Sequence, residues 1–324
     1  MDVEDPALTI ENDLMHSKYV GEGTAGFSKI ARSSAKIMLT TTPNIGCPGF
    51  PLPRPKNVQC LAHVWHSVCD TGFYHMGALD QYDTALTIGD WVQTSIRKIE
   101  NSRNLKPKEV VAVGLPYLDE LAKTTPVHAE RSTPAKILVA PSWGPKSCLA
   151  VYGTEFLIQL AQEGYEIIVR PHPQSLKVEM GFIKEMQEAL SVYETVHFDF
   201  QTSGAASMAQ ADLLISDKSS IRFDFAFLYE KPVLTLDIPL ANLDIYEASL
   251  LGTLWEEGQS ARIGMRMMPE EKEHIVDAVR DALNLTPTDI RTVRSESISH
   301  WGHSDEAIVN WVEEKLKMLN ASGQ

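Results

Sequence analysis

The carboxyl-terminal half of the chain alternates short runs of β-branched residues with longer stretches whose apolar residues recur at helical spacing. Five runs, each ended by Gly, Pro, Asp or Ser, predict strands at residues 136–141, 166–171, 195–200, 211–216 and 231–237. The stretches between them predict helices at Cys148–Gln162, Lys177–Leu190 and Ser219–Tyr229. Apolar strands separated by helices are typical of a buried parallel sheet, so this half is predicted to be a doubly wound α/β layer.

The first 123 residues show a weaker version of the same alternation. Strands are predicted at residues 36–42, 57–66, 82–89 and 109–114, and helices at Asp90–Ile99 and Pro116–Leu121. Little before Lys36 has the pattern of a buried strand. The first sheet is therefore expected to have about four strands where five or six are usual. Either the chain begins inside a longer protein or it carries a reduced version of the fold.

A polar segment with two prolines, residues 124–134, is predicted to link the two halves. We expect two Rossmann-like α/β domains that face each other across a cleft. Residues 1–123 would form the first domain and residues 135–324 the second. Apolar spacing further predicts a helical tail, at Pro269–Leu283 and Ser304–Leu319, that is placed to pack back across both domains.

Composition and charge exclude several classes of protein. Hydrophobic residues make up 44% of the 324 residues and charged residues 22%, as in a globular protein. The formal charge of −14 repels phosphate backbones, so nucleic acid is not an expected partner. No apolar run is long enough to span a membrane and the acidic start is unlike a signal peptide, which predicts a cytosolic protein. Four cysteines without a CxxC pair predict free thiols.

The strongest candidate for chemistry is the segment 216–237, in which a strand ends, a polar loop follows and a helix begins. Asp217 follows the strand directly, and Ser219 and Ser220 stand at the start of the helix. Serine hydroxyls and free backbone N–H groups at a helix start can bind a phosphate with help from the helix dipole. Alternatively, Ser219 only caps the helix and Asp224 is a buried acceptor. Spacing alone leaves both interpretations open.

A second candidate, His172, lies between two prolines just beyond the strand predicted at 166–171. Ligands bind at this edge of open α/β sheets, and the flanking prolines fix the backbone that carries the imidazole. Arg170 adds a permanent cation nearby. The alternative is a rigid turn with a solvent-facing histidine.

In the first half, Cys60, His63, His66 and Cys69 recur every third residue, which raises the question of a zinc site. Residues three apart in a strand point to opposite faces, so His63 and His66 cannot share one ion, and no metal is expected. His66, at the exit of the strand, is better placed for a cleft. His63 is expected to pack beside Trp65.

A Gly and Pro loop at 139–147 places Lys146 and Ser147 before the next helix. Such a loop can wrap a phosphate, but it does not match a Walker A motif and the chain has no GxGxxG, so neither ATP nor NAD nor any other cofactor is expected. A basic group could contact a membrane or a polyanionic acceptor, although such runs are usually solvated helix faces. This group consists of Arg97, Lys98, Arg103, Lys106 and Lys108.

Taken in order, four segments resemble the CDP-glycerol glycerophosphotransferase family, which makes and extends glycerol-phosphate polymers such as teichoic acids and some capsules. They are WHS at 65–67, APSW at 140–143, RPHP at 170–173 and SDKSSIRFDFAFLYEKPVL at 216–234. The resemblance covers roughly residues 36–240 and implies the GT-B architecture, with the active site between two Rossmann-like domains. It further implies that residues 1–123 are the acceptor-side domain and residues 135–324 the domain that binds the nucleotide donor. The chain departs from the family at Ser67, where Gly is usual, and at Lys218, where an aromatic residue is usual.

The resemblance implies that His66 and His172 act in transfer, and that Asp217, Ser219 and Ser220 belong to the loop that holds the donor's pyrophosphate. The other expected substrate-binding residues are Arg170, Lys218, Ser142, Trp143 and Lys146. A hydroxyl of a glycerol-phosphate or glycan acceptor would attack the phosphorus that bears glycerol in CDP-glycerol, and CMP would leave. We expect His66 to be the base, because it lies on the domain that receives the acceptor.

Two alternatives stay open. A nucleotide-sugar glycosyltransferase or epimerase would use the same cleft for a UDP- or GDP-linked sugar, since fold does not determine the reaction. A non-catalytic protein would keep the donor pocket without activity, and the short first half favours it. Family members often act on lipid-linked polymers at the inner face of the membrane, so the resemblance implies peripheral contact with that membrane.

Overall fold

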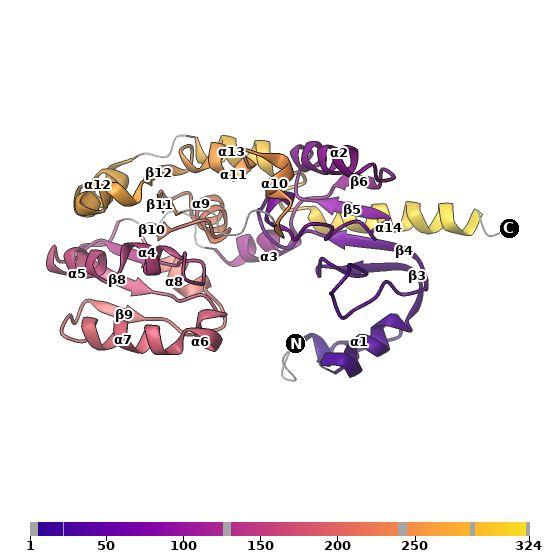
Figure 1. Cartoon of the computed structure of the whole chain (residues 1–324), viewed down its shortest axis with the longest axis horizontal. Coiled ribbons are helices and arrows are strands. Elements are labelled where there is room, and N and C mark those ends of the chain that lie inside the picture. Colours follow the sequence, from indigo (N-terminus) through magenta and orange to yellow (C-terminus); the bar gives the residue numbers. More distant parts are fainter. Residues whose placement is uncertain (1–5, 22, 126–130, 239–244, 286–288, 322–324) are drawn as a thin grey trace.

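Two parallel sheets organise the chain, in the computed structural model that describes residues 6–21, 23–125, 131–238, 245–285 and 289–321 (Figure 1). The first sheet has four strands in the order β3-β4-β5-β6, and the second has six in the order β12-β11-β10-β7-β8-β9. Every neighbouring pair in both sheets is parallel. The predicted α/β class and the four strands predicted for the first half are confirmed.

The second sheet has the strand order of a doubly wound nucleotide-binding fold. Its strands are β7 (Lys136–Val139), β8 (Glu166–Val169), β9 (Val196–Phe198), β10 (Leu213–Ser216), β11 (Val233–Leu236) and β12 (Gly264–Met267). The chain builds outward from β7 to β9, then returns to place β10 on the other side of β7. Ligands bind in such sheets at this reversal, outside the carboxyl ends of the strands. The loops after β7 and β10 therefore border the expected site.

Both faces of the second sheet are covered, which explains why its strands read as continuous apolar runs. One face packs against α4 (Cys148–Tyr152), α5 (Glu155–Gln162), α7 (Met180–Leu190) and α12 (Ile275–Asn284). The other face packs against α8 (Ala205–Gln210) and α9 (Ile221–Tyr229). Alternation along β7 divides the strand between these faces: Ile137 and Val139 contact the first group of helices, and Leu138 contacts the second.

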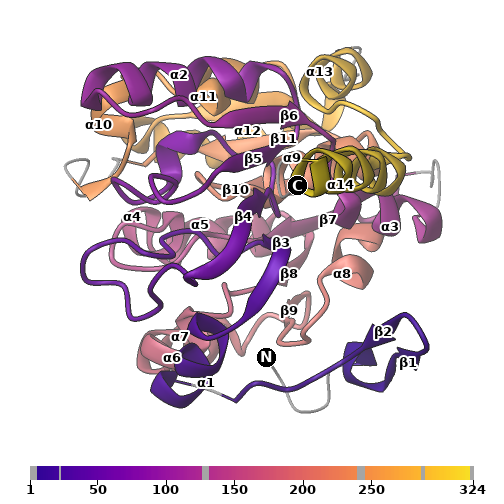
Figure 2. The ribbon, with the colours of Figure 1, turned by 90° about the vertical axis from the view of Figure 1, so that its right-hand side faces the viewer.

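The first sheet is completed by the tail of the chain. Its strands are β3 (Ser34–Thr40), β4 (Asn57–Val64), β5 (Thr84–Thr87) and β6 (Glu109–Ala112), joined in chain order. Right-handed crossovers that always advance in one direction lie on one face, where α2 (Trp91–Arg103) packs. The opposite face is covered by α14 (Ser304–Ala321), which runs along the sheet (Figures 1 and 2). The buried Trp311 of α14 packs on Cys60, Ala62 and Leu86.

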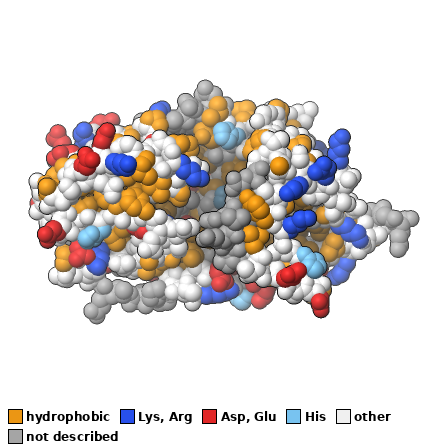
Figure 3. Space-filling view, turned by 90° about the horizontal axis from the view of Figure 1, so that it is seen from below, with side chains coloured by type: hydrophobic (Ala, Val, Ile, Leu, Met, Phe, Trp, Pro, Cys, Tyr) orange, Lys and Arg blue, Asp and Glu red, His pale blue; other side chains and the backbone are white. Residues whose placement is uncertain are grey.

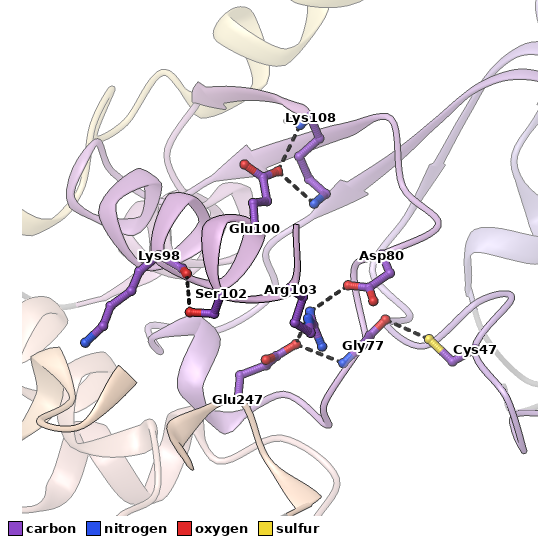
Figure 4. A network of polar contacts seen from close by, with 9 residues as sticks. All are labelled: Cys47, Gly77, Asp80, Lys98, Glu100, Ser102, Arg103, Lys108 and Glu247. Carbon is purple, nitrogen blue, oxygen red and sulfur yellow. Dashed lines mark hydrogen bonds and ion pairs between the residues drawn. The ribbon is translucent and has the colours of Figure 1, made fainter. Parts of the chain in front are cut away.

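A connection that we call the linking segment, residues 245–260, joins β11 to β12 and contacts the first half. It contains α10 (Ala248–Leu251) and α11 (Trp255–Ser260). The Arg103 guanidinium donates to Asp80 at 2.6 Å and to Glu247 at 2.8 Å, and Glu247 also accepts from the Gly77 N–H (Figure 4). Trp255 stacks on Trp91 with ring centroids 4.2 Å apart. The linking segment thus contacts the first half at the start of α10 and at α11.

The basic group of the first half serves these internal ties. Arg97 and Lys108 both pair with the buried Glu100, and the Lys98 ammonium donates to the Leu251 carbonyl at 2.7 Å. Lys106 is exposed. The group as a whole is therefore not a solvated helix face, and that interpretation is wrong. Because most of its cations have internal partners, little unpaired positive charge remains to bind a polyanion.

Several predicted boundaries differ from the structure. The helix predicted at Cys148–Gln162 is two helices, since Gly153 has a positive φ of 75° and ends α4. The sequence pattern missed β12, α8, α10, α11 and α13 (Ile290–Ser297). The remaining elements are η1 (Pro6–Thr9), β1 (Glu11–Asn12), β2 (Met15–His16), α1 (Gly23–Ala31), η2 (Thr71–Phe73), α3 (Pro116–Thr124), α6 (Ser175–Val178) and η4 (Pro269–His274).

The division into domains at residues 123 and 135 stays a prediction, and residues 126–130 of the predicted linker lie outside the described part of the chain. The two sheets fall on either side of that linker. Within the described residues, no helix combines the length and the apolar character that crossing a bilayer requires.

Candidate functional site

A cavity of about 280 Å³ lies where the loops of the two sheets meet. The first half lines it with Ser67, Val68, Cys69, Phe73 and Tyr74. The second half lines it with Ser142, Trp143, His172, Lys218, Ser219, Ser220 and Glu256. Six of the ten predicted site residues, all from the second half, are therefore brought together: Ser142, Trp143, His172, Lys218, Ser219 and Ser220.

The serine pair lies between β10 and α9. The N-cap residue of α9 is Ser220 and not Ser219, and the Ser220 hydroxyl makes no capping hydrogen bond. The interpretation of Ser219 as a helix cap is therefore wrong. Both side chains are half-buried and line the cavity. The nine-residue helix directs its positive dipole end toward the same cavity. Hydroxyls and helix N–H groups in this arrangement suit an anion.

Asp217 lies behind the cavity and organises its wall. The fully buried carboxylate accepts from the Ser142 N–H at 2.8 Å, the Ser142 hydroxyl at 2.9 Å and the Cys148 N–H at 2.8 Å. It also accepts a longer bond from the Ser219 N–H, at 3.3 Å. These bonds tie the loop after β7 to the loop after β10 across the sheet's reversal. Asp217 is not in the cavity lining, and its negative charge disfavours direct contact with a phosphate.

His172 follows β8 and faces the cavity with a fixed tautomer. Its Nδ1 accepts a hydrogen bond from the Gln174 N–H at 3.1 Å, so the proton of the neutral ring is on Nε2. Burial lowers the pKa of this imidazole, while the nearby carboxylates of Asp217 and Glu179 partly oppose that shift. The neutral ring therefore offers Nε2–H as a hydrogen-bond donor.

His66 lies two residues beyond the end of β4, next to the lining residue Ser67. It is exposed and does not line the cavity. Partial burial lowers the pKa of His66, and a hydrogen bond with the Thr41 backbone opposes the shift. By contrast, His63 is fully buried, packs edge-on against Trp65 at 4.9 Å as predicted, and has its pKa lowered to about 3 by burial.

Arg170 and Lys146 lie outside the cavity lining. The Arg170 guanidinium donates to Asp199 at 2.5 Å and to two carbonyls, those of Gln201 and Thr202. It thus holds the loop after β9. Lys146 is exposed in the loop before α4. The sequence pattern alone does not show that Arg170 has partners within the protein or that Lys146 faces solvent.

The sequence pattern missed Glu256, which lines the cavity from α11. Glu256 is 3% exposed, and its Oε1 accepts the Asp70 N–H from the first half. Burial, reinforced by the charge of Asp70, raises the pKa of Glu256 to about 8. Nothing in the local sequence separates it from Glu257, because its burial comes from docking against a residue far away in the chain. Within the described residues, no group of three or more His, Cys, Asp or Glu side chains could hold a metal ion.

Comparisons with known proteins identify the family and the fold of the chain. Residues 78–299 match the family CDP-Glycerol:Poly(glycerophosphate) glycerophosphotransferase. This range includes His172 and the serine pair, whereas His66 precedes it. No curated protein sequence matches the chain.

Solved structures share the fold at low identity. A variant of the wall teichoic acid polymerase TagF soaked with CDPG is 14% identical, with 93% of this chain and 75% of that chain covered and a TM-score of 0.52. A Listeria monocytogenes protein named as a UDP-N-acetylglucosamine 2-epimerase is also 14% identical, with coverage of 94% and 81% and a TM-score of 0.57. TarM is 13% identical, with coverage of 90% and 58% and a TM-score of 0.51. These likenesses confirm the predicted GT-B architecture.

Proposed function

The chain belongs to the CDP-glycerol:poly(glycerophosphate) glycerophosphotransferase family, and from this premise we propose that it transfers glycerol phosphate from CDP-glycerol to a hydroxyl of a polymeric or lipid-linked acceptor, releasing CMP. The observation that carries the proposal is the convergence of His172, Lys218 and the serine pair on one cavity between the sheets. The CDPG soak of the TagF variant supports a cytidine-linked donor.

The donor's pyrophosphate is proposed to bind the hydroxyls of Ser219 and Ser220, the first N–H groups of α9 and the Lys218 ammonium. Burial lowers the pKa of Lys218, although the carboxylates of Glu257 and Asp237 oppose the shift. The exposed indole of Trp143 borders the same cavity and offers a stacking surface for the nucleobase. Asp217 and Arg170 act as positioning residues. Asp217 ties together the loops after β7 and β10 that carry these contacts, and Arg170 ties the segment that leads to His172 to the loop after β9.

In the proposed reaction, an acceptor oxygen forms a bond to the phosphorus that bears glycerol as the bond from that phosphorus to the CMP oxygen breaks. Such transfer depends on positioning and on stabilising the equatorial oxygens more than on covalent chemistry. His172 donates its Nε2–H to one of these oxygens. His66, on the first half and next in sequence to the lining residue Ser67, is proposed to take the proton of the acceptor hydroxyl.

Calorimetric binding tests the donor without knowledge of the acceptor. The purified chain is titrated with CDP-glycerol, CDP, UDP, GDP and ADP. We expect the cytidine ligands to bind most tightly and CMP to be released when CDP-glycerol and a glycerol-phosphate acceptor are supplied together. Preference for UDP or GDP would instead favour a sugar transferase or epimerase, and absence of binding by any nucleotide would favour neither enzyme.

We propose that the enzyme contacts the membrane with the half that holds α1. Lys29, Arg32 and Lys36 are exposed there, and Figure 3 shows Lys and Arg side chains gathered over this half. Anionic lipid surfaces attract exposed cations by about 1 kcal/mol each. Sedimentation with phosphatidylglycerol vesicles should therefore weaken when Lys29 and Arg32 are changed to Glu. Unchanged sedimentation would contradict this placement.

A further inference from the structure

Glu256 is a buried carboxyl with one oxygen left without a protein partner. Its Oε1 is held by the Asp70 N–H, whereas Oε2 is inaccessible and has no hydrogen-bond partner in the part of the chain that the structure describes. A buried polar atom left in this state costs about 1–3 kcal/mol, so a bound molecule is expected to complete it. Glu256 borders two spaces that could supply one: the site cavity and an adjoining cavity of about 10 Å³, the size of one water.

The charge state of Glu256 decides whether the site can hold an anion. Two like charges about 5 Å apart repel by roughly 3 kcal/mol at an effective dielectric constant of about 20, so a carboxylate here would oppose a diphosphate held by Ser219 and Ser220. A protonated carboxyl removes this repulsion and adds an O–H donor. Ketosteroid isomerase, for example, keeps a carboxyl neutral by burial for this purpose.

The surroundings of Glu256 favour the protonated form. Among the described residues it makes no ion pair, since the Arg222 guanidinium donates to the Ser219 carbonyl and to the hydroxyls of Thr235 and Ser260. Burial and the Asp70 charge raise the pKa of Glu256 to about 8, and Arg222 opposes them. The titratable groups around it are Cys69, Asp70 and Tyr74 from the first half, His172 from the loop after β8, Arg222 from α9, Lys218 from the loop before α9, Glu257 from α11, and Asp237 and Arg266 from the adjoining cavity.

We propose that Glu256 is a neutral carboxylic acid in the working enzyme, and that a small rotation of its side chain on donor binding lets Oε2–H donate a hydrogen bond to an anionic oxygen of the donor's diphosphate. The proposal rests on the proposed function, because it takes the ligand to be a nucleoside diphosphate ester. Binding is then coupled to one proton: the site holds the donor only with Glu256 protonated, and the bound anion stabilises that state further.

Calorimetry with CDP measures this coupling directly. For a free-site pKa of about 8, the wild-type dissociation constant should rise about tenfold between about pH 7 and pH 9. Titrations near pH 9 in two buffers of different ionisation enthalpy should show uptake of about one proton per CDP bound. The proton count uses the wild-type chain alone and does not depend on any variant folding.

Two variants isolate the group. Glu256→Gln keeps an acceptor for the Asp70 N–H and a donor on the other side, so it should bind CDP at pH 7 within about threefold of wild type. Near pH 9 it should take up about one proton fewer than wild type, whereas any proton uptake and fall in affinity that Lys218 causes remain in this variant. Glu257→Gln is the matched control on the same helix and should titrate like wild type. Circular dichroism confirms that both variants are folded.

The outcomes separate the two proposals. Wild-type CDP binding with no proton uptake, or with the same uptake in Glu256→Gln, overturns the role of Glu256 and leaves the proposed function standing. Failure of the wild type to bind CDP at any pH, with UDP or GDP bound instead, overturns the cytidine donor. In that case the proton count with the nucleotide that binds still decides whether Glu256 donates to a diphosphate.

Discussion

Removal of the Asp217 carboxylate should destabilise the two loops that line the cavity, although Asp217 itself does not line it. In Asp217→Ala, the N–H groups of Ser142 and Cys148 and the Ser142 hydroxyl lose the acceptor that they reach at 2.8 to 2.9 Å. Each buried group left unsatisfied costs about 1–3 kcal/mol, and neighbouring losses overlap, so the free energy of unfolding should fall by about 3–5 kcal/mol. That is a large share of the 5–15 kcal/mol typical of whole proteins.

Equilibrium urea denaturation measures this loss, with Asp277→Ala as the matched control. Asp277 is an exposed aspartate on α12 that pairs with Arg280, and its removal should cost less than about 0.5 kcal/mol. Asp217→Asn should lie between the two, since the amide oxygen replaces one acceptor while the amide N–H₂ meets the Cys148 N–H. CDP affinity should fall in Asp217→Ala because Ser142 and Trp143 are displaced. The reasoning is refuted if Asp217→Ala is as stable as Asp277→Ala.

The remaining predictions concern two residues of the cavity, one buried histidine and the helix α14. Trp143→Ala should leave stability unchanged and weaken CDP binding about 5- to 100-fold in calorimetry, as expected for loss of one base-stacking surface; equal affinity would contradict stacking. His172→Gln should lower kcat about 10²- to 10³-fold with a smaller change in KM, because the Nε2–H donor acts on developing charge; an unchanged kcat would contradict that role. The pKa of His63 is about 3 when folded and near 6.5 when unfolded, so the unfolded chain binds the extra proton and stability is lost as pH falls below about 6.5. Between about pH 6.5 and pH 4.5 the wild type should lose about 2 kcal/mol more than His63→Gln in urea titrations, and parallel losses would contradict this. Trp311→Ala should cost about 3–5 kcal/mol and speed amide exchange in β4 more than in β7, whereas equal acceleration would mean that α14 does not support the first sheet separately.

The second sheet was largely predictable because its strands are buried on both faces. Short, almost entirely apolar runs such as 136–139 and 213–216 are typical of strands buried on both faces, and they can be recognised in the sequence. β12 was missed because it is an edge strand of Gly, Met and Arg, with only Met267 buried. The short helices α10 and α11 were missed for a related reason: four and six residues are too few to display a helical period.

The candidate site contains residues that local sequence patterns predict and residues whose roles depend on distant segments. His172 and the serine pair follow buried parallel strands directly, and topology alone places such residues at the ligand edge of the sheet. The side-chain partners of Asp217 and Arg170 come from segments 75 and 29 residues away, so their role as positioning residues required the folded structure. Glu256 depended on an even longer connection, 186 residues, to Asp70. Long-range docking leaves no local pattern in the sequence.

Anion binding by uncharged donors reconciles the proposed site with the acidic chain. The formal charge is −14, and the basic group that the sequence offered as an anion-binding surface largely serves ties to Glu100, Asp80 and Glu247. The cavity instead presents serine hydroxyls, helix N–H groups and the Nε2–H of a neutral imidazole, with Lys218 as the cation among its described lining residues. Neutral donors fixed by the surrounding fold lose little on desolvation and stabilise charge that develops during transfer. They also hold a departing nucleotide less firmly than a cluster of cations would, which suits the proposed release of CMP after each transfer.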